Sequence, residues 1–314
     1  MMSFHVCGKV LESNIQIPEL PSANQLKPDL TFYFSPAITA QQEFDWFQQW
    51  SFPNGEKWLS FAKTEGGYLL RFTALADFQI SADGKKIYCF SGTDIPPETI
   101  RHLLLDQVVP LILSHQGHIV FHASCVVLSN GLAVAFLGES GMGKSTLTAY
   151  LTAQGAALVT DDCCLLEERK GRLWVVPSYP GLRLWPENIS GIFSSEVELA
   201  VVAHYTGKKR VLFNRGNLRF CATPVPLHRV YTLSYPENSE AQEISIATIG
   251  PREAFIEVLK HSFHLDITSR QKLIDSTTKL SHLAARDIVR QLSYPRDFFL
   301  LPNVHAALLA DVQK

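Results

Sequence analysis

The sequence predicts an α/β protein in which a smaller, mainly β unit precedes a larger unit of alternating strands and helices. Residues 1–95 read as a meander of short strands separated by turn signals such as Glu65-Gly66-Gly67. Residues 96–314 instead alternate apolar runs of strand length with helical patterns. At 314 residues and 46% hydrophobic content, the chain is long enough for about two domains, here 1–95 and 96–314.

The first domain is expected to pack around its strands and aromatic side chains. Residues 6–17 alternate loosely between apolar and polar, and 18–28 read as a loop. The aromatic cluster at 44–50 has almost no basic residues among it, so it favours packing over stacking on nucleic-acid bases. Further strands are expected at 30–34, 58–62, 68–73, 78–81 and 86–90.

The second domain is expected to begin with a helix over 100–112 that is kinked at Pro110 and ended by Gly117. A long strand should follow at 119–128, with the turn 129–131 leading into the next strand. Beyond these, the pattern predicts strands at 132–137, 157–160, 227–233 and 244–249, a hairpin of 163–167 with 173–176, and helices at 146–154, 252–263, 270–291 and 304–313.

A glycine-rich stretch at 138–146 fits the phosphate-binding pattern G-x-x-x-x-G-K-[ST] at every fixed position. Its backbone N–H groups would wrap a nucleotide's phosphates, while Lys144 reaches the β- and γ-phosphates and Ser145 offers its hydroxyl to Mg²⁺. An apolar run typical of a parallel strand buried on both faces precedes it, and a helix follows. We therefore expect ATP and Mg²⁺ as cofactors, with Lys144 facing solvent and ligand. The loop residues are Gly138, Glu139, Ser140, Gly141, Met142, Gly143, Lys144, Ser145 and Thr146.

Two adjacent acids, Asp161 and Asp162, follow the strand at 157–160. Ligands of open α/β sheets gather at such strand ends, where one carboxylate can hold Mg²⁺ and the other can accept a proton from an attacking hydroxyl. Both can serve one site only if the strand has ended, because neighbouring strand residues face opposite ways. Without the loop, the pair would read as acids that cap a strand. His122, on the strand beside the loop strand, is either a third site residue or a core histidine.

Composition excludes several classes of partner. A net charge of −2 gives no field that would attract nucleic acid or an anionic membrane. Six scattered cysteines without a C-x-x-C pair, and no secretory signal at residues 1–5, favour reduced thiols and a cytoplasmic location. The uncharged stretch 107–138 is interrupted too often by polar residues, glycine and proline to span a membrane.

Three segments together resemble the catalytic core of the HPr kinase/phosphorylase family, whose nucleotide site is related to that of phosphoenolpyruvate carboxykinase. They are Phe121-His122-Ala123-Ser124, the glycine loop, and Val159-Thr160-Asp161-Asp162. The amino-terminal unit is more similar to that of HPr-kinase-related proteins of peptide-modification gene clusters, such as lasso peptide precursor kinases. A Leu-Glu-Ile-Arg-Gly-type segment, which the family carries after the aspartates, is absent from this sequence.

The resemblance implies a phosphoenolpyruvate-carboxykinase-like P-loop core and a role for each motif residue. It implies that Lys144 binds the phosphates and that Ser145 and Asp162 hold the magnesium ion. It also implies that Asp161 is the base that deprotonates the acceptor serine. His122 becomes the catalytic partner of Asp161. HPr kinases assemble as oligomers, so the resemblance also implies a homo-oligomer.

Phosphoryl transfer needs positive charge around the developing transition state. Arg183 and the compact cluster Lys208, Lys209 and Arg210 could supply it as phosphate or acceptor contacts, although the cluster could equally be a solvated loop.

The sequence thus predicts an ATP-dependent kinase of a serine hydroxyl on a peptide or small protein. A kinase of a small hydroxylated metabolite and a non-catalytic nucleotide-dependent switch are the alternatives. Against a GTPase or transporter switch, the sequence has no N-K-x-D and no L-S-G-G-Q segment.

Overall fold

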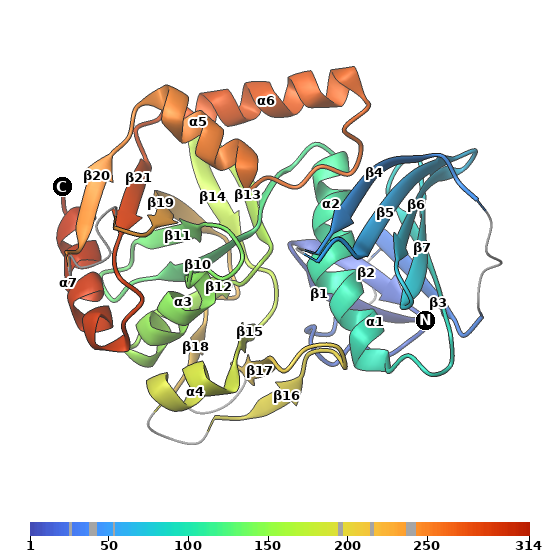
Figure 1. Cartoon of the computed structure of the whole chain (residues 1–314), viewed down its shortest axis with the longest axis horizontal. Helices are drawn as coiled ribbons and strands as arrows, with labels where there is room; N and C mark the ends of the chain where they lie inside the picture. Colours follow the sequence, from blue (N-terminus) through green and yellow to red (C-terminus); the bar gives the residue numbers. More distant parts are fainter. Residues whose placement is uncertain (25–26, 38–42, 53, 194–196, 214–216, 237–242) are drawn as a thin grey trace. The chain divides into compact units, whose positions relative to one another are not determined.

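The computed structural model describes residues 1–24, 27–37, 43–52, 54–193, 197–213, 217–236 and 243–314, which form a mixed α/β protein with several sheets (Figure 1). The chain divides into two compact units. The first comprises 1–116 with 264–272, and the second comprises 117–263 with 273–314. The boundary predicted from the sequence lies at 95/96, whereas the helical segment 97–115 groups with the amino-terminal unit.

The described part of the first unit is built on an eight-stranded sheet in the order β1-β2-β3-β8-β7-β6-β5-β4. The strands β4 to β8 form the expected antiparallel meander, and β3 pairs parallel with both β2 and β8. The chain reverses between β1 and β2 at Cys7 and Gly8, which have φ of 48° and 69°. The strands are β1 (Met2–Val6), β2 (Lys9–Ser13), β3 (Leu30–Ser35), β4 (Trp46–Ser51), β5 (Lys57–Thr64), β6 (Gly67–Phe72), β7 (Ala76–Ser81) and β8 (Lys86–Ser91).

One helical run, α1 (Pro97–Leu103), η1 (Leu104–Val108) and α2 (Val109–His115), follows the strands of this unit. Its middle section is a π-helical turn, in which the N–H of Val109 bonds the carbonyl of Leu104. Pro110 follows immediately and has no N–H to donate, so the wider turn sits where a regular helix would lose a hydrogen bond. The irregularity that the sequence predicts at Pro110 therefore takes the form of a π-turn.

The second unit contains a ten-stranded sheet within the described residues. Its order is β18-β12-β10-β11-β19-β14-β13-β9, with β21 beside β19 and β20 beside β21. The loop strand β11 is fully buried as expected, but it is parallel only to β19 and antiparallel to β10. The strands are β9 (Ile119–Phe121), β10 (Ala123–Val127), β11 (Ala133–Leu137), β12 (Ala157–Thr160), β13 (Cys164–Arg169), β14 (Arg172–Val176), β18 (Arg219–Phe220), β19 (Val225–Ser234), β20 (Ser245–Thr248) and β21 (Val289–Ser293).

Helices cover both faces of this sheet. Val134 and Phe136 of β11 share one apolar cluster with residues of α3 and α7, whereas Ala133, Ala135 and Leu137 share another with residues of α5 and α6. Side chains that alternate along β11 thus contribute to two cores, one on each face. The helices are α3 (Lys144–Ala153), α5 (Pro251–Lys260), α6 (Arg270–Ala284), the 3₁₀ turn η2 (Phe298–Leu300) and α7 (Leu301–Asp311).

Two sequence predictions are wrong in this unit. The helix expected over 270–291 ends at Ala284, and the chain then turns through Asp287, at φ 52°, into β21, which pairs with β19 and β20. The strand expected over 119–128 is broken at His122, because β9 pairs with β13 whereas β10 pairs with β11 and β12.

A small three-stranded sheet lies against α3. Its order is β15-β17-β16, and Leu182, Leu184 and Val211 from it cluster with Ala149 of α3. The elements are β15 (Gly181–Leu184), α4 (Pro186–Ile192), β16 (Leu199–Val201) and β17 (Lys209–Leu212).

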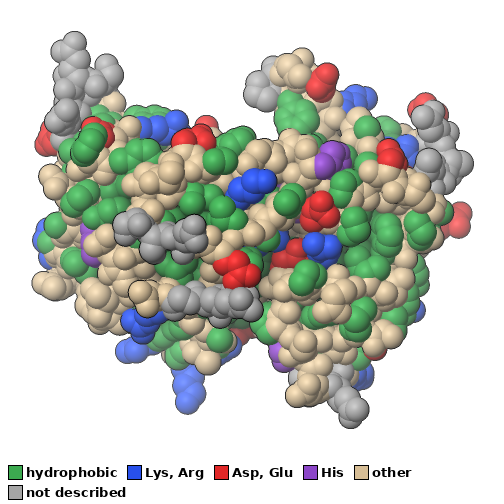
Figure 2. Space-filling model, turned by 90° about the horizontal axis from the view of Figure 1, so that it is seen from below, with side chains coloured by type: hydrophobic (Ala, Val, Ile, Leu, Met, Phe, Trp, Pro, Cys, Tyr) green, Lys and Arg blue, Asp and Glu red, His purple; other side chains and the backbone are tan. Residues whose placement is uncertain are grey.

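Within the described residues, no helix is both long enough and apolar enough to cross a bilayer. All six cysteines are free thiols. On the face seen in Figure 2, acidic and basic side chains are interspersed among hydrophobic ones, as expected for a net charge of −2.

Candidate functional site

The glycine loop joins β11 to α3 in the predicted order of strand, loop and helix. Gly141 and Gly143 have φ of 88° and 90°, a left-handed backbone that residues with a Cβ adopt only at a cost. A Cβ on Gly138 would lie 3.2 Å from the Cβ of Met142 and 3.3 Å from that of Leu233. The loop therefore needs glycine at these three positions, for its curvature or for its close packing.

Lys144 is buried rather than facing solvent, so that expectation is wrong. Its side chain folds back into the loop, where Nζ donates to the carbonyl oxygens of Gly138 at 2.6 Å and Glu139 at 3.1 Å. Burial lowers the pKa of Lys144 to about 8, with further lowering by the charges of Lys208 and Arg183. The carboxylate of Asp161 opposes this shift in pKa. Positive charge is thus concentrated where the loop would meet phosphate.

The two aspartates lie on a turn that directly follows β12. The strand ends at Thr160, and Asp162 adopts φ 61°, outside the extended region. The N–H of Cys163 bonds the Asp161 carbonyl at 2.8 Å, and the Thr160 hydroxyl lies 2.6 Å from the carbonyl oxygen of Cys163. Because the strand has ended, both carboxylates can face the same site, which is the condition that the sequence analysis sets.

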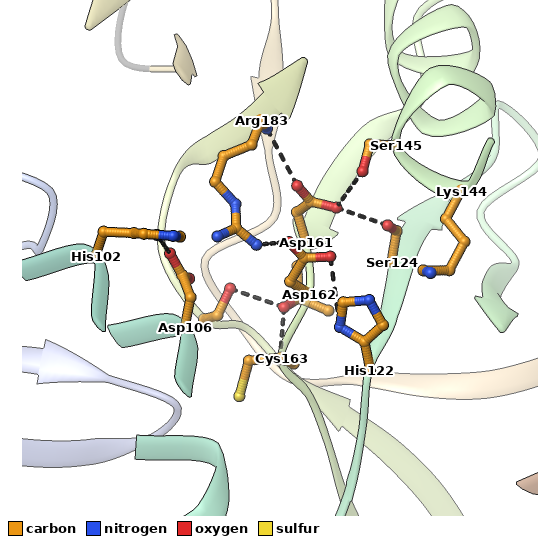
Figure 3. A network of polar contacts seen from close by, with 12 residues as sticks. His102, Asp106, His122, Ser124, Lys144, Ser145, Asp161, Asp162, Cys163 and Arg183 are labelled. Carbon is orange, nitrogen blue, oxygen red and sulfur yellow. Dashed lines mark hydrogen bonds and ion pairs between the residues drawn. The ribbon is translucent and has the colours of Figure 1, made fainter. Parts of the chain in front are cut away.

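The carboxylate of Asp161 is buried and held by three donors (Figure 3). The hydroxyls of Ser124 and Ser145 donate to its Oδ1 at 2.7 Å and 3.2 Å, and the backbone N–H of Arg183 donates to its Oδ2 at 3.1 Å. The turn is thereby connected to β10, to the first turn of α3 and to β15. Ser145 of the glycine loop thus contacts Asp161.

The carboxylate of Asp162 faces a different set of groups. It forms an ion pair with the guanidinium of Arg183, and its Oδ1 lies 3.7 Å from Nδ1 of His122. The resemblance pairs Ser145 with Asp162 and His122 with Asp161, whereas the contacts pair Ser145 with Asp161 and His122 with Asp162.

His122 is positioned by the break between β9 and β10. Its backbone N–H donates to the carbonyl of His261 at 2.8 Å, and its ring lies edge-on to Phe263 at 6.2 Å between centroids. Desolvation lowers the pKa of His122 well below its usual value, and the nearby charges of Lys144 and Arg183 lower it further. The ring is therefore neutral at pH 7, and it keeps access to solvent because 37% of the side chain is exposed.

The predicted basic residues occupy different positions around the site. Arg183, in β15, contacts both aspartates as described above. Lys208 lies 5.8 Å from the ring centroid of Trp185 and is close enough to Lys144 to lower the pKa of that lysine. Lys209 lies in β17 opposite Leu184.

Arg210 belongs to the core of the small sheet. It is 1% exposed, and its guanidinium lies 5.5 Å from the ring centroid of Tyr179. Its Cδ would come within 2.8 Å of a Cβ at Gly181, so its stem occupies the space that this glycine leaves.

Sequence reasoning gives no role to Ser124, although this residue lies two positions after His122 in a segment that the resemblance singles out. It also misses Tyr294 and Arg296, which approach the glycine loop from the end of β21. No short motif marks these two residues, and they lie about 150 positions after the loop.

The oxygens of Ser145 and Asp161 fit a magnesium ion. They are hard ligands, and Mg²⁺ in nucleotide sites needs only one or two protein ligands beside water and phosphate. In the described part of the chain, no group of three or more histidine, cysteine or acidic side chains could hold a metal ion by itself.

No known protein-family pattern matches this sequence, and no curated protein is similar to it in sequence. Among solved structures, it has a similarity to the Hpr(Ser) kinase/phosphatase from Coxiella burnetii, with 14% sequence identity and a TM-score of 0.28. The similarity covers 62% of this chain and 97% of that one. A TM-score this low does not assign the chain to that family.

Proposed function

We propose that this protein transfers the γ-phosphoryl group of ATP, with Mg²⁺, to a serine hydroxyl of a peptide or small protein. One observation carries the proposal: a single turn presents one carboxylate to the serine of the glycine loop and the next carboxylate to His122 and Arg183. A nucleotide switch needs only the first of these contacts. A kinase needs both, because it must hold the donor and orient the acceptor.

On the donor side, Lys144 and the loop N–H groups bind the phosphates, and Ser145 with Asp161 holds the metal. Bound there, Mg²⁺ would neutralise charge that develops on the phosphates. Phosphate oxygens replace the carbonyls of Gly138 and Glu139 as partners of the Lys144 ammonium. Phosphate binding therefore raises the pKa of a lysine whose pKa is lowered in the free protein, and so stabilises its protonated form.

On the acceptor side, Asp162 orients the serine hydroxyl. The serine oxygen bonds to the γ-phosphorus, the bond from that phosphorus to the β–γ bridging oxygen breaks, ADP leaves, and the hydroxyl proton passes to Asp162. This assignment exchanges the roles that the resemblance gives to the two aspartates. It is supported by the burial of Asp161, which has three donors, whereas Asp162 is partly exposed.

The test is mass spectrometry of candidate peptides incubated with the protein, ATP and Mg²⁺, first among them any small peptide encoded beside its gene. We expect phosphate on serine with the wild-type protein. Asp162→Asn should bind ATP and Mg²⁺ normally but lose transfer, whereas Asp161→Asn should raise the Mg²⁺ concentration needed for half-maximal rate. Asp94→Asn, at an exposed loop position, is the matched control and should behave as wild type.

Two outcomes would change these conclusions. If Asp162→Asn kept transfer while Asp161→Asn lost it at every Mg²⁺ concentration, the base would be Asp161 and our exchange of roles would be wrong. If ATP bound but no peptide gained phosphate, a metabolite kinase would become the better reading, followed by a nucleotide switch.

A further inference from the structure

Two exposed side chains lie beyond the strand ends on the side of β11 that faces away from the aspartates. The strands β11, β19 and β21 are parallel neighbours, and Leu137, at the end of β11, pairs with Thr232 of β19. Their carboxyl ends therefore form one edge of the sheet, where nucleotides bind in open α/β folds. Tyr235 is the first residue after β19, and Arg296 lies three residues after β21.

Arg296 and the neighbouring Tyr294 lie against the glycine loop itself. Nη2 of Arg296 lies 3.5 Å from the position of a Cβ on Gly141, and Oη of Tyr294 lies at the same distance from that on Gly143. Tyr294 is buried, and burial raises its pKa far above the usual value, so it stays a neutral phenol. Arg296 thus lies at the edge of the predicted phosphate cradle.

The guanidinium of Arg296 lies over the ring of Tyr235. The guanidinium carbon of Arg296 lies 5.1 Å from the ring centroid of Tyr235, and 44% of Tyr235 remains exposed. Both groups offer a π-face, and tyrosine rings and arginine guanidiniums are the side chains on which nucleobases stack. An exposed aromatic ring held in this way provides a surface on which a base can stack.

The order of the sheet fixes which end of a nucleotide would reach this pair. The strands run β12-β10-β11-β19-β21, so the aspartates after β12 and His122 before β10 lie on one side of the glycine loop, and Tyr235 and Arg296 lie on the other. In our proposed function the γ-phosphate points toward the aspartates. The nucleoside end of the same molecule then extends over β19 and β21.

We propose that Tyr235 and Arg296 bind the base of the nucleoside triphosphate by stacking. This proposal rests on the proposed function, because it uses the direction in which the phosphates lie. It gives the pair a role distinct from phosphate binding, which Lys144 and the loop N–H groups already provide.

Base stacking and phosphate binding can be told apart with a ligand that carries phosphates but no base. We expect Tyr235→Ala to weaken ATP binding about ten-fold or more, as for other single stacking side chains, with inorganic tripolyphosphate binding unchanged within about two-fold. Arg296→Ala should weaken ATP binding more than tripolyphosphate binding, because it removes a stacking surface as well as a positive charge beside the loop. Tyr235→Phe keeps the ring and should bind ATP as wild type does. Tyr88→Ala, which removes a tyrosine that is 39% exposed in the first unit, is the matched control and should change neither affinity.

If either alanine variant lost affinity for ATP and for tripolyphosphate to the same extent, the proposal would be overturned, because the side chain would then contact phosphate and not the base. Unchanged ATP binding in both alanine variants would also overturn it while leaving the proposed function intact. If the wild-type protein bound tripolyphosphate but no nucleotide, the proposed function would fail as well.

Discussion

The buried ammonium of Lys144 predicts that nucleotide binding takes up a proton. In the free protein, burial and neighbouring positive charge lower the pKa of this lysine to about 8. A bound triphosphate brings several negative charges to the ammonium and returns the pKa to its usual range above 10. The nucleotide therefore binds the protonated protein more tightly, and its affinity should fall as pH rises through 8.

The size of the effect follows from these two pKa values. At pH 7 about nine-tenths of the free protein carries the proton on Lys144, and at pH 9.5 only about 3% does. If the lysine stays protonated in the complex, affinity falls about 30-fold between these pH values, which corresponds to about 2 kcal/mol. At pH 8, binding should take up about half a proton per nucleotide.

Isothermal titration calorimetry of ADP in buffers of different ionisation enthalpy measures that proton uptake directly. ADP at pH 8 and above is already fully ionised, so the proton must come to the protein. Lys57→Met, which removes an exposed lysine of the first unit, should leave the uptake unchanged. An affinity independent of pH from 7 to 9.5, with no proton taken up at pH 8, would refute the reasoning.

Three further predictions concern stability and the shape of the loop. Lys144→Met should raise the free energy of unfolding of the nucleotide-free protein at pH 7 by about 1 to 3 kcal/mol. The difference in the free energy of unfolding between this variant and the wild type should shrink between pH 8 and 10.5, because there the lysine is neutral in the folded protein but still charged in the unfolded chain. Urea unfolding at pH 7 and 9.5 measures this difference. Ser124→Ala removes a 2.7 Å hydrogen bond to buried Asp161 and should cost about 1 to 3 kcal/mol by the same method, and a cost under about 0.5 kcal/mol would contradict the contact. Gly143→Ala, at φ 90°, should cost about 1 to 2 kcal/mol and abolish ATP binding, whereas Gly131→Ala, at φ 85° in open space, should lower stability alone.

Residue types at short spacing mark the glycine loop and the two aspartates as candidate site residues, and the resemblance adds His122 to them. The loop must have glycines where its backbone turns left-handed, and the acids must follow a strand that ends. The structure brings Ser145, Asp161 and Asp162 together, as those patterns predict. Their chemical roles stay predictions.

The pairing of the aspartates could not be predicted, because it depends on backbone angles within one turn. Asp162 adopts φ 61°, and this conformation directs its side chain to Arg183 and His122 instead of Ser145. Aspartate adopts a positive φ more readily than most non-glycine residues, but the sequence does not show which of two adjacent aspartates does so. The burial of Lys144 has a similar cause, since it depends on where two loop carbonyls point.

Longer-range elements were predicted less well for a related reason. The segment 288–292 carries apolar residues that suit either the end of a helix or a short strand, and it becomes β21 because β19 and β20 both offer unpaired edges there. Tyr235 and Arg296 depend on that strand for their position, so their proximity to the glycine loop could not be read from spacing.

The core of the candidate site is carried by one contiguous piece of chain. The strands β10, β11 and β12 follow one another in the sequence and are also neighbours in the sheet. Contacts between segments so close in sequence close short loops, which is entropically cheap and kinetically fast. We therefore expect this part of the sheet to assemble early in folding, before the distant strands β19 and β21 dock beside it. A newly made chain would then hold its phosphate cradle and its aspartates before the surface on which a base could stack.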